Sequence, residues 1–154
     1  MTAAPAAPSA PACPYCPPGA AAVPMAALVS FGFLHGDPPR ADITVDLREH
    51  FRDPHAVDGL RELTADDPRV TAAVLATSGI PALIGALRAT ARAYLAGGRT
   101  VTIAIGCAGG RHRSAAVARQ VGRQLEADGV PVTVIHRDIS RPVVGRGLER
   151  GRPS

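Results

Sequence analysis

A short stretch in the second half of the chain, Gly106–Ser114, concentrates residue types that bind anions. It reads GCAGGRHRS, so three glycines stand beside two arginines, a histidine, a cysteine and a serine. Glycines let backbone N–H groups turn toward a ligand, while arginine and histidine supply charged or switchable donors. The stretch therefore predicts a phosphate site, here called the ligand loop. Its expected ligand residues are Gly109, Gly110, Arg111, His112, Arg113 and Ser114.

The ligand loop lies between a predicted strand and a predicted helix. Arg99–Gly106 is the clearest strand, and from about residue 112 apolar residues recur at Val117, Val121 and Leu125, as on one helix face. Pro131–His136 predicts the next strand. A strand–turn–helix–strand of this length indicates a βαβ unit with parallel strands, in which ligands bind at the carboxyl ends of the strands. A helix N-terminus at the ligand loop would add partial positive charge.

The rest of the pattern predicts one α/β domain with a mostly parallel sheet of about four strands and covering helices. Ala26–Phe33 and Asp42–Leu47 are expected strands, and the polar stretch 48–66 is long enough to suggest a functional loop. Asp67 and Pro68 predict the start of a short helix. A longer helix after Pro81 would place these residues on one face: Leu83, Ile84, Leu87, Ala91, Tyr94 and Leu95.

Composition excludes several protein classes. All 17 basic residues are arginine, so a Walker phosphate loop and a Schiff-base lysine are both impossible within these 154 residues. No apolar stretch reaches the roughly 18 residues of a membrane span, and the proline-rich N-terminus lacks a basic region typical of signal peptides. We expect a cytoplasmic protein without a membrane partner, and no metal or cofactor is indicated.

The chain divides into three predicted parts. Residues 1–24 are rich in Ala and Pro and are expected to be disordered, residues 25–138 form the folded domain, and residues 139–154 form an Arg-rich flexible tail. The tail either follows a nucleic-acid backbone or is a solvated end. Cys13 and Cys16 form a C-x-x-C pair without the context of a zinc or redox site, so we interpret it as accidental.

Three further residues are expected near the ligand loop. His35 follows the first strand, at the same predicted sheet edge, where its imidazole could bind a ligand hydroxyl or phosphate. Asp46 and Arg48 are two apart on a strand and share a face, so they could pair with each other or with a ligand.

Four other polar residues are expected to be plain surface. Arg119 and Arg123 are one helical turn apart and predict a solvated helix face. His50 and His55 lie in the polar stretch without metal-ligand spacing, so both are expected to face solvent.

Two alternatives remain open from the residues alone. Cys107–Ser114 has the C-x5-R-S spacing of cysteine-dependent phosphatases, in which a thiolate attacks phosphorus and the arginine holds the oxygens. Gly106 replaces the histidine usual before that cysteine, and nothing distinguishes Asp46 or Asp53 as the general acid. The other alternative is an RNA-binding module without a small ligand.

Three separated stretches resemble the C-terminal domain of the RapZ family, also called YvcJ-like proteins. They are SFGFLHG at Ser30–Gly36, VDLRE at Val45–Glu49 and TIAIGCAGGRHRS at Thr102–Ser114, and the resemblance extends from about Ala27 to Asp138. An Asp-Pro replaces the family's usual Asn-Pro after the second strand. The family's N-terminal P-loop ATPase activity is not implied here, because the required lysine is absent.

The resemblance implies a fold similar to a phosphofructokinase subdomain and binding of an amino-sugar phosphate, such as glucosamine-6-phosphate, and of RNA. It places six residues in the sugar-phosphate pocket and two on its other side: His35, Cys107, Gly109, Gly110, His112 and Arg113, then Asp46 and Arg48. The expected function is therefore a sensor or adapter with an RNA or protein partner rather than an enzyme. Nothing in the sequence indicates an oligomeric state.

Overall fold

The computed structural model describes residues 23–51 and 59–143. The predictions of a disordered N-terminus, of the Cys13–Cys16 pair and of a flexible tail fall largely or wholly outside these ranges. In chain order the elements are β1 (Ala26–Gly32), a short 3-10 helix η1 (Phe33–His35), β2 (Ile43–Asp46), α1 (Pro68–Leu75), α2 (Ile80–Ala96), β3 (Val101–Cys107), α3 (Arg113–Ala127) and β4 (Val132–His136).

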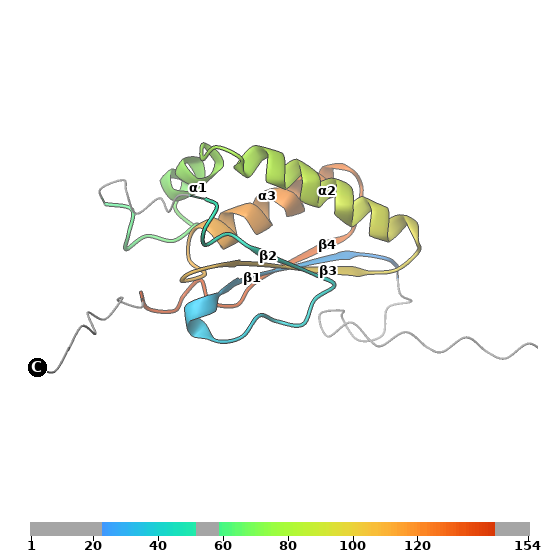
Figure 1. The fold of residues 1–154 in the computed structure, drawn as a ribbon. Helices are drawn as coiled ribbons and strands as arrows, with labels where there is room; N and C mark the ends of the chain where they lie inside the picture. Colours follow the sequence, from blue (N-terminus) through green and yellow to red (C-terminus); the bar gives the residue numbers. More distant parts are fainter. Residues whose placement is uncertain (1–22, 52–58, 144–154) are drawn as a thin grey trace, which may run out of the picture.

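The four strands form one parallel sheet in the order β2-β3-β1-β4, and the three α-helices cover one of its faces (Figure 1). The register pairs Gly32 with Cys107, Asp46 with Gly106 and Ser30 with His136. All four carboxyl ends therefore meet at the same edge, together with the start of α3. This confirms the expected single α/β domain with a parallel four-stranded sheet.

Helix α3 forms the centre of the core because it lies directly on the sheet. Val117, Val121 and Leu125 are fully buried, as their four-residue spacing predicts. A Cβ atom at Gly122 would lie 2.9 Å from a methyl carbon of Val134, so glycine allows the helix to approach β4 closely.

Helices α1 and α2 pack outside α3 (Figure 1). The Asp67 carboxylate accepts a hydrogen bond from the Arg69 amide, which confirms the predicted cap of α1. Arg88 of α2 forms an ion pair with Asp128, the residue that caps the carboxyl end of α3, and this hydrogen bond lowers the pKa of Asp128. None of the helices described is long and apolar enough to cross a membrane alone; α1 and α2 meet that test only together, and they are bent by 88°.

Two local expectations were wrong. The first strand ends at Gly32, and Phe33 begins η1, because the chain turns there to bring Leu34 N–H to the Ala108 carbonyl at 3.0 Å. Tyr94 was expected on the buried face of α2 but is 49% exposed. Only part of the apolar face of α2 packs against the rest of the protein. The buried residues of this helix are Ile80, Ile84, Leu87 and Ala91.

Candidate functional site

The ligand loop joins the end of β3 to the start of α3, at the carboxyl edge of the sheet. Cys107 Sγ lies at its base, 3.2 Å from Ser114 Oγ, and accepts a hydrogen bond from the Gly110 amide at 3.2 Å. Cys107 is 3% exposed and Ser114 is fully buried. The cysteine therefore closes the loop on itself and fixes the first turn of α3.

The back of the ligand loop rests on the end of β1. A Cβ atom at Gly32 would lie only 2.5 Å from the Gly109 carbonyl carbon. Gly110 has φ +75°, and a Cβ there would lie 2.8 Å from the Gly32 nitrogen and 2.9 Å from Asp138 Cβ. Glycine is thus required at both positions because the end of β1 and the ligand loop are in backbone contact. Gly110 also allows the positive φ of the turn.

A segment before α1 holds the other side of the ligand loop. Residues 62–66, here called the support segment, make three hydrogen bonds to it. Leu63 O lies 2.7 Å from His112 Nε2, the Ala65 amide donates to Arg111 O at 2.8 Å, and Arg111 Nη2 donates to Glu62 O at 2.8 Å. His112 is only 5% exposed, so its ring orientation is fixed by this segment.

Arg113 lies inside the protein rather than on its surface. It is 4% exposed, and its Nη1 donates to the carbonyls of Leu47 at 2.8 Å and Phe51 at 2.6 Å, with a longer contact to Arg48 O at 3.4 Å. These bonds hold the chain that follows β2 against the start of α3. Its role in binding phosphate stays a prediction.

Three buried side-chain atoms have no hydrogen-bond partner among the residues described: the nitrogens Arg111 Nε, in the ligand loop, and His35 Nε2, and the oxygen Asp138 Oδ1, which takes part only in the ion pair with Arg141. The Arg111 nitrogen is always an N–H donor, and an imidazole nitrogen can be one. His112, the N-cap residue of α3, makes no side-chain capping hydrogen bond to the first turn of that helix. Buried donors without an acceptor and an uncapped helix N-terminus together favour an anionic ligand.

Asp46 and Arg48 form a bidentate ion pair with each other, which is one of the two arrangements expected from their spacing; the other is contact with a ligand. Arg48 Nη2 lies 2.7 Å and Nε 3.0 Å from Asp46 Oδ2. This hydrogen bond lowers the pKa of Asp46, so the carboxylate is ionised at neutral pH. The Arg48 guanidinium also stacks 3.8 Å from the centre of the Phe33 ring, which ties β2 to the turn before His35.

Sequence reasoning missed a buried carboxylate. Asp138 is 0% exposed; its Oδ2 accepts a hydrogen bond from the Gly32 amide at 2.8 Å and one from Arg137 Nε at 2.9 Å. Arg141 Nε lies 3.1 Å from its Oδ1. The sequence signal that could have found Asp138 is its place two residues after β4, next to Arg137 and three residues before Arg141.

The expectation of a solvated Arg119 was wrong. Its guanidinium donates to His136 Nε2 at 3.0 Å and to Ala65 O at 2.7 Å, and it pairs with Asp66. Arg123, one turn later, is exposed as expected. His50 is also exposed, whereas His55 lies outside the residues described.

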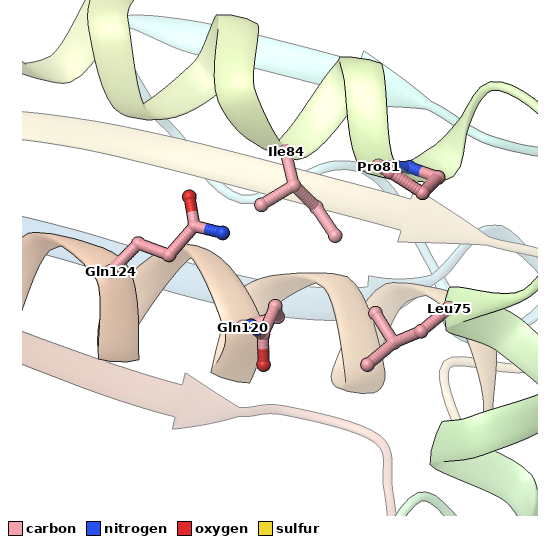
Figure 2. Close-up of a pocket in the computed structure, with 5 residues that line it drawn as sticks. All are labelled: Leu75, Pro81, Ile84, Gln120 and Gln124. Carbon is pink, nitrogen blue, oxygen red and sulfur yellow. The ribbon is translucent and has the colours of Figure 1, made fainter.

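A small pocket of about 160 Å³ lies elsewhere, between the three helices (Figure 2). Its lining comes from α1, α2 and the middle of α3 rather than from the helix N-terminus: Leu75, Pro81, Ile84, Gln120 and Gln124. This pocket contains no ionisable side chain, so it does not compete with the ligand loop as a phosphate site.

The arrangement at the ligand loop suits binding more directly than covalent chemistry. The phosphatase alternative requires an arginine that grips phosphate, and here Arg113 Nη1 contacts backbone carbonyls. Its cysteine is also covered and bonded within the loop. In the described part of the chain, no group of three or more His, Cys, Asp or Glu side chains converges to hold a metal ion.

The chain is similar in sequence to known proteins over most of its length. Residues 25–140 match the RapZ C-terminal domain. Curated relatives include nucleotide-binding proteins of Frankia alni (44% identical), Thermobifida fusca (39%) and Mycobacterium avium (39%), with 75%, 75% and 80% of this chain aligned. The chain covers only 42%, 41% and 44% of those proteins. It belongs to the RapZ C-terminal domain family.

Proposed function

We propose that this domain is a regulatory sensor that binds a phosphorylated small molecule, specifically an amino-sugar phosphate, at the ligand loop. The observation that carries the proposal is the pair of buried nitrogens, His35 Nε2 and Arg111 Nε, that lack an acceptor among the described residues. A phosphate supplies several acceptor oxygens, and the uncapped start of α3 favours its negative charge.

His35 gives the most specific test of the proposed binding site. It follows Leu34, whose amide bonds to the Ala108 carbonyl in the ligand loop, so the backbone next to His35 is held against that loop. Its Nε2 makes no hydrogen bond to any described residue, so its removal leaves no described partner unsatisfied. Loss of His35 should therefore reduce ligand binding and leave the stability of the free protein nearly unchanged.

Asp46 supports the amino-sugar part of the proposal. Its carboxylate is ionised and lies at the same carboxyl edge of the sheet, opposite Gly106 of β3 in the register. A sugar ammonium group beside it would gain a charge-assisted hydrogen bond that a neutral hydroxyl lacks. The ligand would then be recognised by its phosphate at the loop and by its amine at Asp46.

The relatives' names support a phosphate-bearing ligand in a broader sense, since these longer proteins are called nucleotide-binding. This chain has no lysine for a Walker loop, so a nucleotide would have to bind through other residues. We propose that the bound state is passed on to an RNA or protein partner and that the domain works in the cytoplasm.

The test is a thermal-shift and calorimetric screen of the full chain with glucosamine-6-phosphate, glucose-6-phosphate, glucosamine and AMP. A ligand at a hundredfold above its Kd should add about 2.7 kcal/mol to the free energy of unfolding. We expect glucosamine-6-phosphate to stabilise the wild type and His50→Ala, the control at an exposed histidine, and to fail with His35→Ala. Equal stabilisation of all three proteins contradicts the site assignment. No stabilisation by any compound favours the RNA-binding alternative.

A further inference from the structure

The side chain of His136, at the end of β4, bridges β1 and α3. Its Nδ1 lies 2.7 Å from Ser30 Oγ, and its Nε2 lies 3.0 Å from Arg119 Nε. The arginine nitrogen is always a donor, so His136 Nε2 must accept. The proton of a neutral ring is then on Nδ1 and is donated to Ser30. The surrounding bonds therefore select the neutral form of His136.

The other end of Arg119 holds the support segment. Its Nη1 donates to Ala65 O at 2.7 Å, and its Nη2 pairs with Asp66 Oδ1. Thr64 Oγ1 donates to the second oxygen of Asp66 at 2.9 Å, which completes the attachment. One guanidinium thus joins the end of β4 to the segment that fixes His112 and Arg111.

We propose that Arg119 is a positioning residue for the ligand loop, and that protonation of His136 releases its hold on the support segment. A proton on Nε2 replaces the acceptor that Arg119 Nε needs and puts two cationic groups 3.0 Å apart. The guanidinium must then move, and its bonds to Ala65 O and Asp66 move with it. The predicted effect on ligand affinity rests on the proposed function, whereas the movement itself does not.

The charges around His136 set the pH range of this release. From α3 it faces Arg119, from the support segment it faces Asp66, and from β1 it faces the uncharged Ser30. Burial, followed by the charge of Arg119, lowers the pKa of His136 below its ordinary 6.5, and Asp66 opposes this only in part. The ring is therefore neutral at neutral pH and becomes charged on acidification.

The first experiment is an NMR pH titration of the ligand-free full chain. The His136 ring resonances and the Ala65 and Arg111 amides should shift with one common midpoint, below pH 6.5. In His136→Gln, whose amide oxygen can accept from Arg119 but cannot be protonated, the amide shifts at that midpoint should disappear. In His50→Gln they should remain. If the Ala65 and Arg111 amides of the wild type do not shift at the midpoint of His136, the proposal is overturned, even if the variant does not fold.

The second experiment measures the Kd for glucosamine-6-phosphate between pH 7.5 and pH 5.5. The ligand's own ionisation affects wild type and His136→Gln alike, so the ratio of their Kd values isolates the effect of His136. We expect wild type to lose about fivefold or more affinity relative to the variant on acidification. A ratio that stays constant with pH overturns the effect on affinity. If neither protein binds the ligand at any pH, the proposed function fails, and the NMR titration alone decides the release.

Discussion

The Asp138 carboxylate accepts a hydrogen bond from the Gly32 amide at 2.8 Å, joining the residue two positions after β4 to the last residue of β1. Gly32 in turn lies directly behind Gly109 of the ligand loop. The ion pairs of Asp138 with Arg137 and Arg141 hold the carboxylate in place from the other side. A buried carboxylate therefore supports the ligand loop from behind, through the backbone of Gly32.

Replacing Asp138 should destabilise the domain strongly. Asp138→Ala leaves the buried Gly32 N–H without an acceptor and Arg137 without its counter-charge, which should cost about 3 kcal/mol of unfolding free energy. Glu126→Ala, at an exposed carboxylate of α3, should change it by about 0.5 kcal/mol or less. Urea unfolding followed by circular dichroism measures both. Similar small losses in the two variants would show that the buried ion pair contributes little.

A methyl group at Gly32 should displace the ligand loop. In Gly32→Ala the new Cβ would lie 2.5 Å from the Gly109 carbonyl carbon, and that backbone cannot yield as a flexible side chain does. We expect a loss of about 2 kcal/mol and changed amide resonances from Cys107 to Arg113. The matched control is Gly85→Ala in α2, where a Cβ meets nothing within 4 Å and should stabilise the helix by up to about 1 kcal/mol. Equal stability of the two variants contradicts the close approach.

The sequence was sufficient for those features that depend on neighbours along the chain. Apolar spacing located α3 and its buried face, Asp67 and Pro68 located the start of α1, and the glycines located the loop after β3. These signals are local, because a helix face or a cap is set by residues within one or two turns. The parallel direction of the strands also followed from them, since a strand–helix–strand unit joins parallel strands.

The sequence was insufficient where a side chain finds its partner across the fold. Arg119 bonds to Ala65, 54 positions away, and Asp138 to Gly32, 106 positions away. A helical spacing with Arg123 predicts a shared face, but it cannot show that β4 ends with His136 beside one of the two arginines. Arg113 is a similar case, since the chain after β2 that receives its Nη1 has no regular pattern.

Cys107→Ser separates a binding site from a phosphatase. Serine keeps a group that can accept from the Gly110 amide and contact Ser114, so the loop should retain its shape. We expect the affinity for glucosamine-6-phosphate to be unchanged, and neither protein to hydrolyse p-nitrophenyl phosphate. Hydrolysis by the wild type that is abolished in Cys107→Ser, with binding intact, would establish the phosphatase alternative instead.

Asp46→Asn should remove the preference for an amine. The amide keeps the size of the carboxylate but loses its charge, so the bonus for a sugar ammonium disappears. We expect the Kd for glucosamine-6-phosphate to rise about tenfold and that for glucose-6-phosphate to stay unchanged. Glu49→Gln, an exposed carboxylate three residues further on, is the control and should alter neither Kd. An equal rise for both sugars would mean that Asp46 acts through Arg48 rather than on the amine.

Asp66→Asn should lower the free energy of unfolding only at pH values at which the Asp66 carboxylate is ionised. The hydrogen bond from Arg119, followed by that from Thr64, lowers the pKa of Asp66 below its ordinary 3.8. Its contribution is therefore complete above pH 3.8 and is lost as the pH falls through the lowered value. Because the side chain is 64% exposed, we expect a difference from wild type of at most about 1 kcal/mol at pH 7.

That difference should begin to shrink as the pH falls below 3.8, because the unfolded wild type then takes up a proton at this position, and it should vanish below the lowered pKa of the folded protein. Urea unfolding at pH 7, 5 and 3 checks this, with Asp37→Asn as the control at an exposed aspartate. His136 has a lowered pKa, so its contribution to the free energy of unfolding declines as the pH falls below 6.5. The contribution of Asp66 should begin to decline only at lower pH. A variant that loses the same stability at pH 3 as at pH 7 would show that residue 66 acts by its shape and not by its charge.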